Sequence, residues 1–302
     1  MKRNQPHKHI FILLFFCTAC FAFQSAKSQE SSKPVVYTAK EVREDLRYLY
    51  TTLQQSHYNL FVNTSKTRYD QAYKNLELKI KDQMSLIEVN RLFQPFTALS
   101  GLAHCSIAFP FQPSYLEYLE KGGKVFPLDV SVNQGRLYVA DNYSQDSSVK
   151  AGDEIIQINS KPTAYALEQI YQYLSGENNA FKNTLIDLYH FSRLHWLVFG
   201  GGDSFKLRLK RADGSAYVIV LPGIPAEQLE AYAAKKKSIF NPGREFKFLG
   251  EVAYLHPGAF MNSESDGNTS DHQTFENSEF VRFIDSAFYQ VQKAGATQLI
   301  ID

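Results

Sequence analysis

The spacing of apolar residues changes near residue 125 of this chain of 302 residues, and that change restricts its fold more than any other feature. Up to about residue 100, apolar side chains recur every three or four residues, the period of a helix that buries one face. From Val125 onward they occur in short alternating runs such as "VFPLDVSV" and "RLYVAD", the period of strands. The chain is therefore predicted to fold as a helical part followed by a part rich in strands.

Helix starts are marked in the first part by two capping boxes, "TAKE" at 38–41 and "SLIE" at 85–88. In a capping box a hydroxyl and a carboxylate each satisfy backbone amides at the start of a helix. A middle helix is predicted to start near Ser65, where tyrosines and leucines again follow the helical period. Three helices with short connections predict a small helical bundle over about residues 35–110.

The strand-rich part is predicted to form one module over residues 122–222. The run "AGDEIIQINSKPT" reads as strand, turn and strand and is followed by the helical "AYALEQIYQYLS". A longer helical segment is predicted from Asn178 to Val198, as an insertion in the module. The module closes on two alternating strands joined by a hairpin at Ala212-Asp213-Gly214.

A third unit is predicted over residues 246–302. The strand "FLGEVAYLHPGAF" is followed by a polar loop, by a helix that stops at Gly295, and by "ATQLIID". That last run is nearly continuously apolar, the type of strand that is buried on both faces of an α/β sheet. Such a strand needs neighbours, so we expect an interrupted chain that contains only the N-terminal part of an α/β domain. The predicted fold class is a multidomain α+β protein: a helical bundle, a β-rich module and the start of an α/β domain.

Residues 1–28 are predicted to be a secretory signal peptide. Basic residues precede an apolar run of 14 residues at 10–23, and Ala26-Lys27-Ser28, with small residues at its first and third positions, offers a cleavage site. A helix that spans a bilayer needs about 20 apolar residues, so no stable membrane span is expected. The protein is predicted to be exported, to a periplasm or the cell exterior. A lipid on Cys20 is an alternative that its flanking residues disfavour.

Loss of that segment changes the charge and the cysteine count. Lys plus Arg falls from 32 to 28 against 31 Asp plus Glu, a net charge of −3, so no nucleic acid partner is expected. Cys105 is then the one cysteine that remains of the three, and no internal disulfide can form. We expect stability to come from packing alone.

The order of these units resembles a known family. "AGDEIIQINSKP" is similar to the strand-and-turn signature of a PDZ module, except that Ser160 replaces the usual glycine. With the helices before it and the "VAYLHPGAF" and "LIID" runs after it, the chain over about residues 38–302 resembles the C-terminal processing, or tail-specific, serine peptidases. The resemblance includes their branch similar to the tricorn core protease.

The turn "LSGLAHCSIAFP" resembles the Asp-Gly-His-Thr turn that ends a helix in this family. Ala103 replaces the glycine, Cys105 replaces the threonine, and the aspartate is missing, but His104 falls on the histidine. In the tricorn-like branch that histidine is the general base of a serine nucleophile, whereas other members use a lysine. The serine and the lysine lie beyond the strand that corresponds to "LIID".

The resemblance therefore implies an exported serine-type endopeptidase that works through an acyl-enzyme, without metal or organic cofactor. The 302 residues alone are expected to be inactive, because the segment that bears the nucleophile is absent from them. A second interpretation, from a different class, is a non-catalytic PDZ-type protein that binds peptides without cleaving them.

Each candidate catalytic residue also has a structural interpretation. An imidazole titrates near pH 6.5 and can accept a serine proton, but His104 could instead be a structural histidine at a helix end. Cys105 could itself be a nucleophile, but adjacent residues in extended backbone face opposite sides, so His104 and Cys105 are badly placed to share a proton. Cys105 is predicted instead to be a small buried thiol in the position of the family's threonine. The amide of Gly258 could hold the oxyanion of acyl transfer, or the residue could be required only by the turn after Pro257.

The PDZ-like module is predicted to bind polypeptides, through their C-termini. In such modules an extended peptide adds to a sheet edge and backbone amides hold its carboxylate. Gly122 and Gly123 occupy the position of those amides, and Phe126 and Leu128 are candidates for the groove wall. The alternative is that these two apolar side chains fill the core of the module.

No metal site is predicted. His190 and His195 are five residues apart, a spacing that places them on different faces of a helix. Packing in the core or exposure on the surface is the expectation for both histidines.

Overall fold

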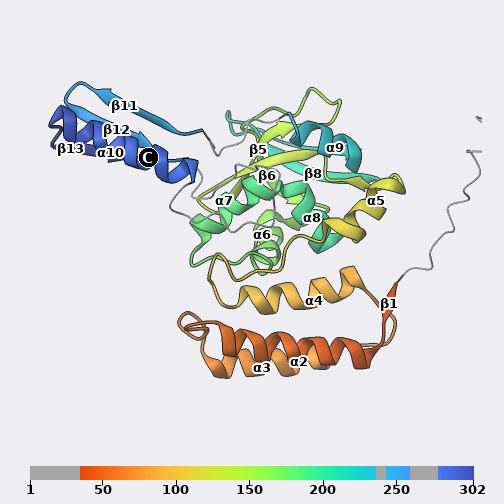
Figure 1. The fold of residues 1–302 in the computed structure, drawn as a ribbon. Helices are drawn as coiled ribbons and strands as arrows, with labels where there is room; N and C mark the ends of the chain where they lie inside the picture. Colours follow the sequence, from red (N-terminus) through yellow and green to blue (C-terminus); the bar gives the residue numbers. More distant parts are fainter. Residues whose placement is uncertain (1–34, 236–242, 259–277) are drawn as a thin grey trace, which may run out of the picture. The chain divides into compact units, whose positions relative to one another are not determined.

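The computed structural model describes residues 35–235, 243–258 and 278–302. The chain divides into two compact units, Met1–Tyr232 and Ala233–Asp302 (Figure 1). The predicted signal peptide and Cys20 lie outside the described residues. Among the helices that are described, none has the length and apolar character needed to cross a bilayer.

Three helices form the bundle at the start of the first unit. Both capping boxes are confirmed, and Ser65 caps the middle helix as predicted. In the second box the Ser85 amide donates to the Glu88 carboxylate at 2.8 Å, and this bond, aided by Lys81, lowers the pKa of Glu88 to about 2. The elements are β1 (Val36–Tyr37), α2 (Ala39–Ser56), α3 (Lys66–Glu77), β2 (Met84–Ser85) and α4 (Leu86–Ala98).

Aromatic rings hold the bundle together. Tyr50 and Tyr69 stack at 5.9 Å between ring centroids, and Phe96 packs edge-on against both rings at 5.4 Å. All three side chains are buried. Because Phe96 belongs to α4, its ring joins that helix to the other two.

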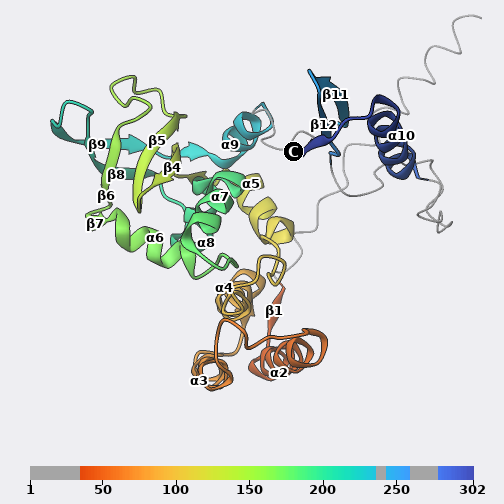
Figure 2. The same cartoon turned by 90° about the vertical axis from the view of Figure 1, so that its left-hand side faces the viewer.

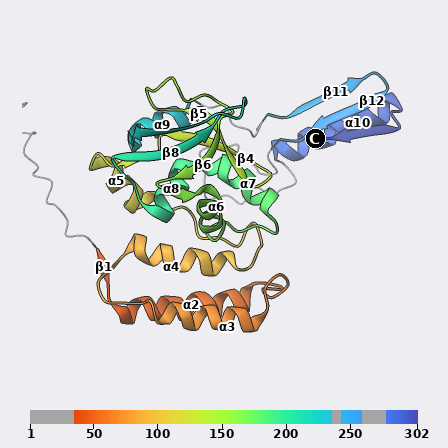
Figure 3. The same ribbon diagram turned by 180° about the vertical axis from the view of Figure 1, so that it is seen from behind.

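Helix α4 lies between the α2–α3 pair and the strand-rich module, as the views in Figure 1, Figure 2 and Figure 3 agree. The Arg91 guanidinium donates to Leu197 O at 2.7 Å, and the Gln94 amide donates to Tyr173 O at 2.9 Å. These bonds attach the bundle to the module. The connecting segment is a π-helical turn (Phe111–Tyr115) and α5 (Leu116–Glu120).

The module is built on an antiparallel sheet with the order β4-β5-β6-β8-β9, to which β7 adds beside β6. The hairpin predicted at Ala212-Asp213-Gly214 is confirmed, and Gly214 takes the left-handed backbone at φ 88° that favours glycine. The strands are β3 (Lys124–Val125), β4 (Leu128–Asn133), β5 (Arg136–Asn142), β6 (Glu154–Ile158), β7 (Lys161–Pro162), β8 (Ser204–Lys210), β9 (Ala216–Pro222) and β10 (Ile224–Pro225).

Helices of the module pack on this sheet over a core of buried apolar side chains. The helices are α6 (Thr163–Tyr171), α7 (Asn179–Tyr189), α8 (Phe191–Phe199) and α9 (Ala226–Ala233). The prediction of one helical segment over 178–198 is wrong in one respect, because the segment breaks at His190. That residue has φ 63°, and its ring bonds to Asp129 on β4.

The second unit contains β11 (Glu245–Leu249), β12 (Val252–His256), α10 (Glu279–Ala294) and β13 (Gln298–Ile301). Strands β12 and β13 pair in parallel, and α10 lies between them in the sequence, which is a β-α-β arrangement. The prediction that the last strand is buried on both faces is wrong: Ile300 is 48% exposed and Ile301 is 61% exposed. Within the described residues β13 is an edge strand with β12 as its single neighbour. The predicted fold class of mixed helices and sheets is confirmed.

Candidate functional site

The turn that carries His104 is fixed to the end of α4. Gly101 has φ 63° and its amide donates to Ala98 O at 3.0 Å, the usual way for a glycine to end a helix. The Asn63 amide donates to Ser100 O at 3.1 Å, and the Ser100 hydroxyl accepts from Leu102 N at 3.2 Å. The backbone before His104 is therefore held from two sides.

His104 is exposed on the wall of an open cavity of about 630 Å³. His57, at the end of α2, and Glu177 also line this cavity. No hydrogen bond holds the His104 ring in the part of the chain that the structure describes, so the imidazole is accessible to a group that enters the cavity. The rest of the wall is largely apolar and includes Leu49, Leu53, Leu102, Ala103 and Ile107.

The Cys105 thiol does not share the exposed position of the His104 ring. Its side chain is partly buried, and its Sγ lies 3.9 Å from Thr97 O, back toward α4. The Cys105 carbonyl accepts a hydrogen bond from the Ser175 hydroxyl at 2.5 Å, which ties the turn to the strand-rich module. Among the described residues, no bond joins the thiol to the neighbouring imidazole.

The amides of Gly122 and Gly123 are already used within the chain. The Gly122 amide donates to Leu119 O at 2.9 Å and the Gly123 amide donates to Tyr118 O at 2.8 Å. Gly122 has φ 71°, so the pair ends α5 as a helix cap. In this structure the two amides are therefore not available to a peptide carboxylate.

Phe126 and Leu128 are fully buried and belong to the core of the module. Their side chains thus follow the alternative interpretation, in which they fill the core instead of lining an open groove. Helix α8 covers them: the Phe191 ring packs edge-on against Phe126 at 5.2 Å, and the Ser192 Oγ lies 2.7 Å from Phe126 O and 3.1 Å from Leu128 O. The Ser192 hydroxyl thus lies within hydrogen-bond distance of two carbonyl groups at the start of β4, and it can donate to one of them at a time.

A buried hydrogen-bonded pair, Asp129 and His190, fixes this cover in place. The Asp129 Oδ2 lies 2.9 Å from His190 Nδ1, and the Asp129 Oδ1 accepts a bond from Phe191 N at 3.4 Å. The Tyr143 hydroxyl donates to Asp129 Oδ2 at 3.3 Å. The sequence reasoning missed Asp129, although a single acidic residue inside the apolar run "VFPLDVSV" was a signal that it needs a buried partner.

His195 is a core residue. It is 5% exposed, its ring stacks on Phe126 at 5.4 Å, and its Nδ1 has no hydrogen-bond partner in the structure. Burial removes water from the charged ring and lowers the pKa of His195 to about 4. Across the described ranges, no group of three or more His, Cys, Asp or Glu residues could hold a metal ion.

Gly258 belongs to the second unit, whereas His104 belongs to the first. It has φ 68°, a conformation that favours glycine, so the turn after Pro257 accounts for the residue type. Two residues earlier, the His256 Nδ1 lies 3.1 Å from Asp302 O. The role of Gly258 as an oxyanion donor stays a prediction.

The architecture of the module agrees with a comparison to family models, in which residues 122–230 match the PDZ domain. These residues form a PDZ domain. Helices α7 and α8, which lie between β7 and β8 in the sequence, pack against β4 of this PDZ domain.

Solved structures similar to the chain include three of CPAF, a serine protease. They are mature CPAF complexed with lactacystin (14% identity, TM-score 0.48), a CPAF mutant (16%, 0.49) and mature CPAF (15%, 0.46). The similarity covers 87% of this chain in each case, and 56%, 56% and 55% of the CPAF chains. The chain thus spans little more than half the length of these structures. A comparison with curated proteins gives no match.

Proposed function

We propose that this chain contains the general base and the peptide-binding region of an exported serine-type endopeptidase of the tail-specific kind. The observation that carries the proposal is the position of His104. Its ring is exposed on a cavity of about 630 Å³, on a turn held between the helical bundle and the PDZ domain. The resemblance of the His104 turn to the histidine turn of that family supports the same role.

In the proposed reaction a serine hydroxyl attacks a peptide carbonyl and His104 accepts the hydroxyl proton. A C–O bond forms, the C–N bond breaks, and the proton passes from His104 to the leaving amine. Water then hydrolyses the acyl-enzyme with His104 again as the base. We propose that the serine lies in the same gene product, after Asp302, and that the Gly258 amide stabilises the oxyanion.

The cavity also suggests what the enzyme accepts. Its wall beside His104 is apolar, with Leu53, Leu102 and Ile107 among its residues. An apolar substrate side chain buried there contributes about 1.5–3 kcal/mol of binding free energy. We therefore propose that the scissile bond lies next to an apolar residue.

The test begins with the coding DNA beyond the codon for Asp302, which should continue in frame to a serine after a glycine-rich turn. The whole frame, expressed and purified, should react with a fluorophosphonate probe and cleave casein. His104→Ala should lower kcat by about 10⁴-fold or more, because the general base is lost. Added imidazole should restore part of the activity, since it replaces the missing ring.

His57→Ala is the matched comparison. His57 lines the same cavity, but its Nδ1 accepts a hydrogen bond from Asn59 N at 3.1 Å, a structural role. This variant should raise KM and leave the pH profile of kcat unchanged. Near-normal turnover by His104→Ala in the whole protein would contradict the assignment of the base.

A non-catalytic peptide-binding protein is the second candidate. It is favoured by one observation: across the described ranges, no hydroxyl or thiol is hydrogen-bonded to His104. If the reading frame stops after Asp302, and the protein binds peptides but reacts with no fluorophosphonate, the second candidate is correct and the first is wrong.

A further inference from the structure

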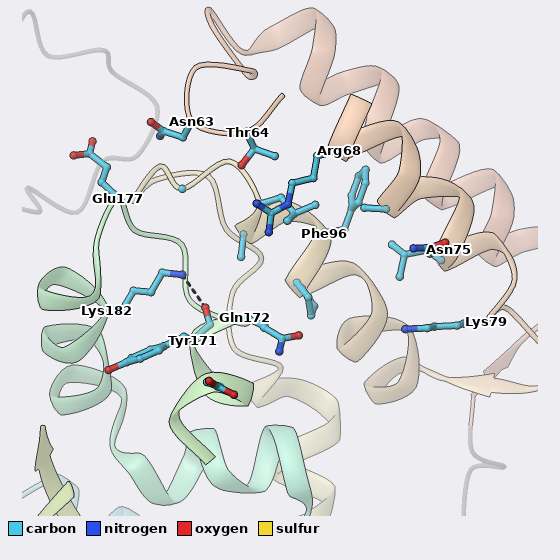
Figure 4. A pocket seen from close by; sticks show the side chains of 17 residues that line it. Asn63, Thr64, Arg68, Asn75, Lys79, Phe96, Tyr171, Gln172, Glu177 and Lys182 are labelled. Carbon is cyan, nitrogen blue, oxygen red and sulfur yellow. Dashed lines mark hydrogen bonds between the residues drawn. The ribbon is translucent and has the colours of Figure 1, made fainter. Parts of the chain in front are cut away.

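A second cavity, of about 640 Å³, lies between the helical bundle and the PDZ domain (Figure 4). Helices α3 and α4 form one side, and α6 with α7 forms the other, all within the first unit. Its apolar wall comes from the bundle and consists of Ala72, Leu76, Pro95, Phe96, Ala98 and Leu99.

Three basic side chains from separate segments meet at this cavity: Arg68 on α3, Lys79 after α3, and Lys182 on α7. No ion pair joins any of the three to a carboxylate in the described part of the chain. Figure 4 shows Arg68 and Lys182 extending toward each other across the space. An anion that lies between two cations is attracted by both.

Lys182 is the most constrained of the three. Its ammonium donates to Tyr171 O at 2.9 Å, and partial burial lowers its pKa because the charged form loses water. A carbonyl dipole compensates only part of that loss. A carboxylate at this position would supply the missing charge and a strong hydrogen bond.

Two acidic residues, Glu168 and Glu177, also line the cavity, and both are exposed. In Figure 4 the Glu177 side chain points away from Arg68. With three basic and two acidic side chains, the lining has a net charge of +1, and Figure 4 shows the side chains of Arg68, Lys79 and Lys182 extending into the space. The inner part of the cavity is therefore suited to an anion.

The inserted helices connect this cavity to the closed β4 edge. Helix α7 contacts β4, and Ser192 on α8 lies 3.1 Å from the Leu128 carbonyl at the start of β4. The same insertion supplies Lys182 to the cavity. A peptide that cannot add to β4 thus meets a basic cavity with an apolar wall on the other side of the insertion.

We propose that this cavity binds a carboxylate of a polypeptide between Arg68 and Lys182, with the adjoining apolar side chain against Phe96 and Leu99. That the ligand is a polypeptide rests on the proposed function. The carboxylate has two sources, a free C-terminus and an acidic side chain, which the experiment separates.

The experiment uses the full chain and three probes. They are the tripeptide N-acetyl-Ala-Val-Leu with a free carboxylate, its C-terminal amide, and N-acetyl-Ala-Val-Glu amide. The rate at which an N-hydroxysuccinimide ester acylates Lys182 at pH 7.5 is measured by mass spectrometry, with Lys74 as the internal reference. Lys74 is exposed on α3 and is not part of the cavity wall. A carboxylate probe should slow acylation of Lys182 at least fivefold and leave the rate at Lys74 unchanged.

Binding constants are then measured by calorimetry for Arg68→Gln, Lys182→Met and the control Lys74→Met. The first two should weaken binding of the carboxylate probe at least tenfold, the control by less than twofold, and Arg68→Lys should retain most of the affinity. Fluorescence of Trp196, the one tryptophan in the sequence, confirms that each variant is folded. Binding by the free-carboxylate peptide alone assigns the C-terminus, and binding by the glutamate peptide assigns an acidic side chain.

Any of three results would overturn the inference. The acid and amide probes could bind equally, no probe could protect Lys182 from acylation, or the affinity could survive both Arg68→Gln and Lys182→Met. These outcomes are separate from the test of the proposed function. Casein cleavage that depends on His104 but not on Arg68 or Lys182 would leave the peptidase proposal intact and remove this site. Carboxylate binding without any hydrolysis would support this site and contradict the peptidase proposal.

Discussion

His195 links the packing of the PDZ domain to its stability in acid. The ring lies on α8 with 5% of its surface exposed, stacked on Phe126 at 5.4 Å and edge-on to Phe205 at 5.5 Å. Burial lowers the pKa of His195 from its ordinary value of 6.5 to about 4. In the unfolded chain the ring is hydrated and regains the ordinary value.

The sign of the effect follows from proton binding. Between pH 6.5 and pH 4 the unfolded chain binds a proton at this ring that the folded chain does not, so the free energy of unfolding falls as the pH falls. Well above pH 6.5 the ring has no effect, and well below pH 4 the loss is complete. The two pKa values differ by about 2.5, and each unit corresponds to about 1.4 kcal/mol, which gives a full loss of about 3 kcal/mol. At pH 4.5 the loss relative to pH 7 is about 2 kcal/mol.

The perturbation is His195→Phe, which keeps an aromatic ring in this cluster and removes the titrating group. The larger ring lowers stability by about 1–3 kcal/mol, but it does so at every pH. Urea unfolding at pH 7 and pH 4.5, followed by the fluorescence of Trp196, gives the pH dependence for both proteins. The natural protein should lose about 2 kcal/mol more than the variant between the two pH values. Equal losses would refute the reasoning, since they would mean that the folded protein protonates His195 at its ordinary pKa.

Two further substitutions test the packing around the inserted helices. Gly201→Ala should lower the free energy of unfolding by about 3 kcal/mol, because the new methyl group would overlap the Lys124 carbonyl. Its control is Gly202→Ala, where the nearest atom to the new methyl group is 3.7 Å away. In the same urea titration the control should change the free energy of unfolding by less than about 1 kcal/mol. Asp129→Ala should cost about 1–3 kcal/mol, because it removes the acceptor that the buried Tyr143 hydroxyl, the Phe191 amide and the His190 ring share, and hydrogen exchange should show faster opening of α8.

Local signals in the sequence were sufficient for the start of each bundle helix. A capping box such as Thr38 with Glu41 is complete within four residues, so its chemistry can be read without knowing the rest of the fold. The signal for the hairpin turn at Ala212-Asp213-Gly214 is equally local. The turn that carries His104 was also located, because a glycine that ends a helix is visible in the sequence.

The occupation of the β4 edge was not predictable in the same way. It depends on Asp129 and His190, which are 61 residues apart and come together only when α7 and α8 fold over the sheet. The helical period of residues 178–198 predicts a continuous segment, and the break at His190 follows from its tertiary bond to Asp129. The cavity with Arg68 and Lys182 was missed for the same reason, since its cations come from elements that are distant in the sequence.

The alternation of apolar residues at Phe126 and Leu128, just before and at the start of β4, predicts that both side chains are buried. It does not predict which segment covers them. A bound peptide and an inserted helix would bury the same side chains, and the sequence of the strand is compatible with either. In both cases the backbone carbonyl groups at the strand edge need a hydrogen-bond donor. The two cases differ in whether that donor comes from a bound peptide or from the chain itself. Ser192 provides a donor to this edge from within the chain. A peptide that displaced Ser192 would also have to offset the loss of the Phe191 packing and of the Asp129–His190 hydrogen bond. This is why we place peptide recognition on the basic cavity beside α7 and not on the β4 edge.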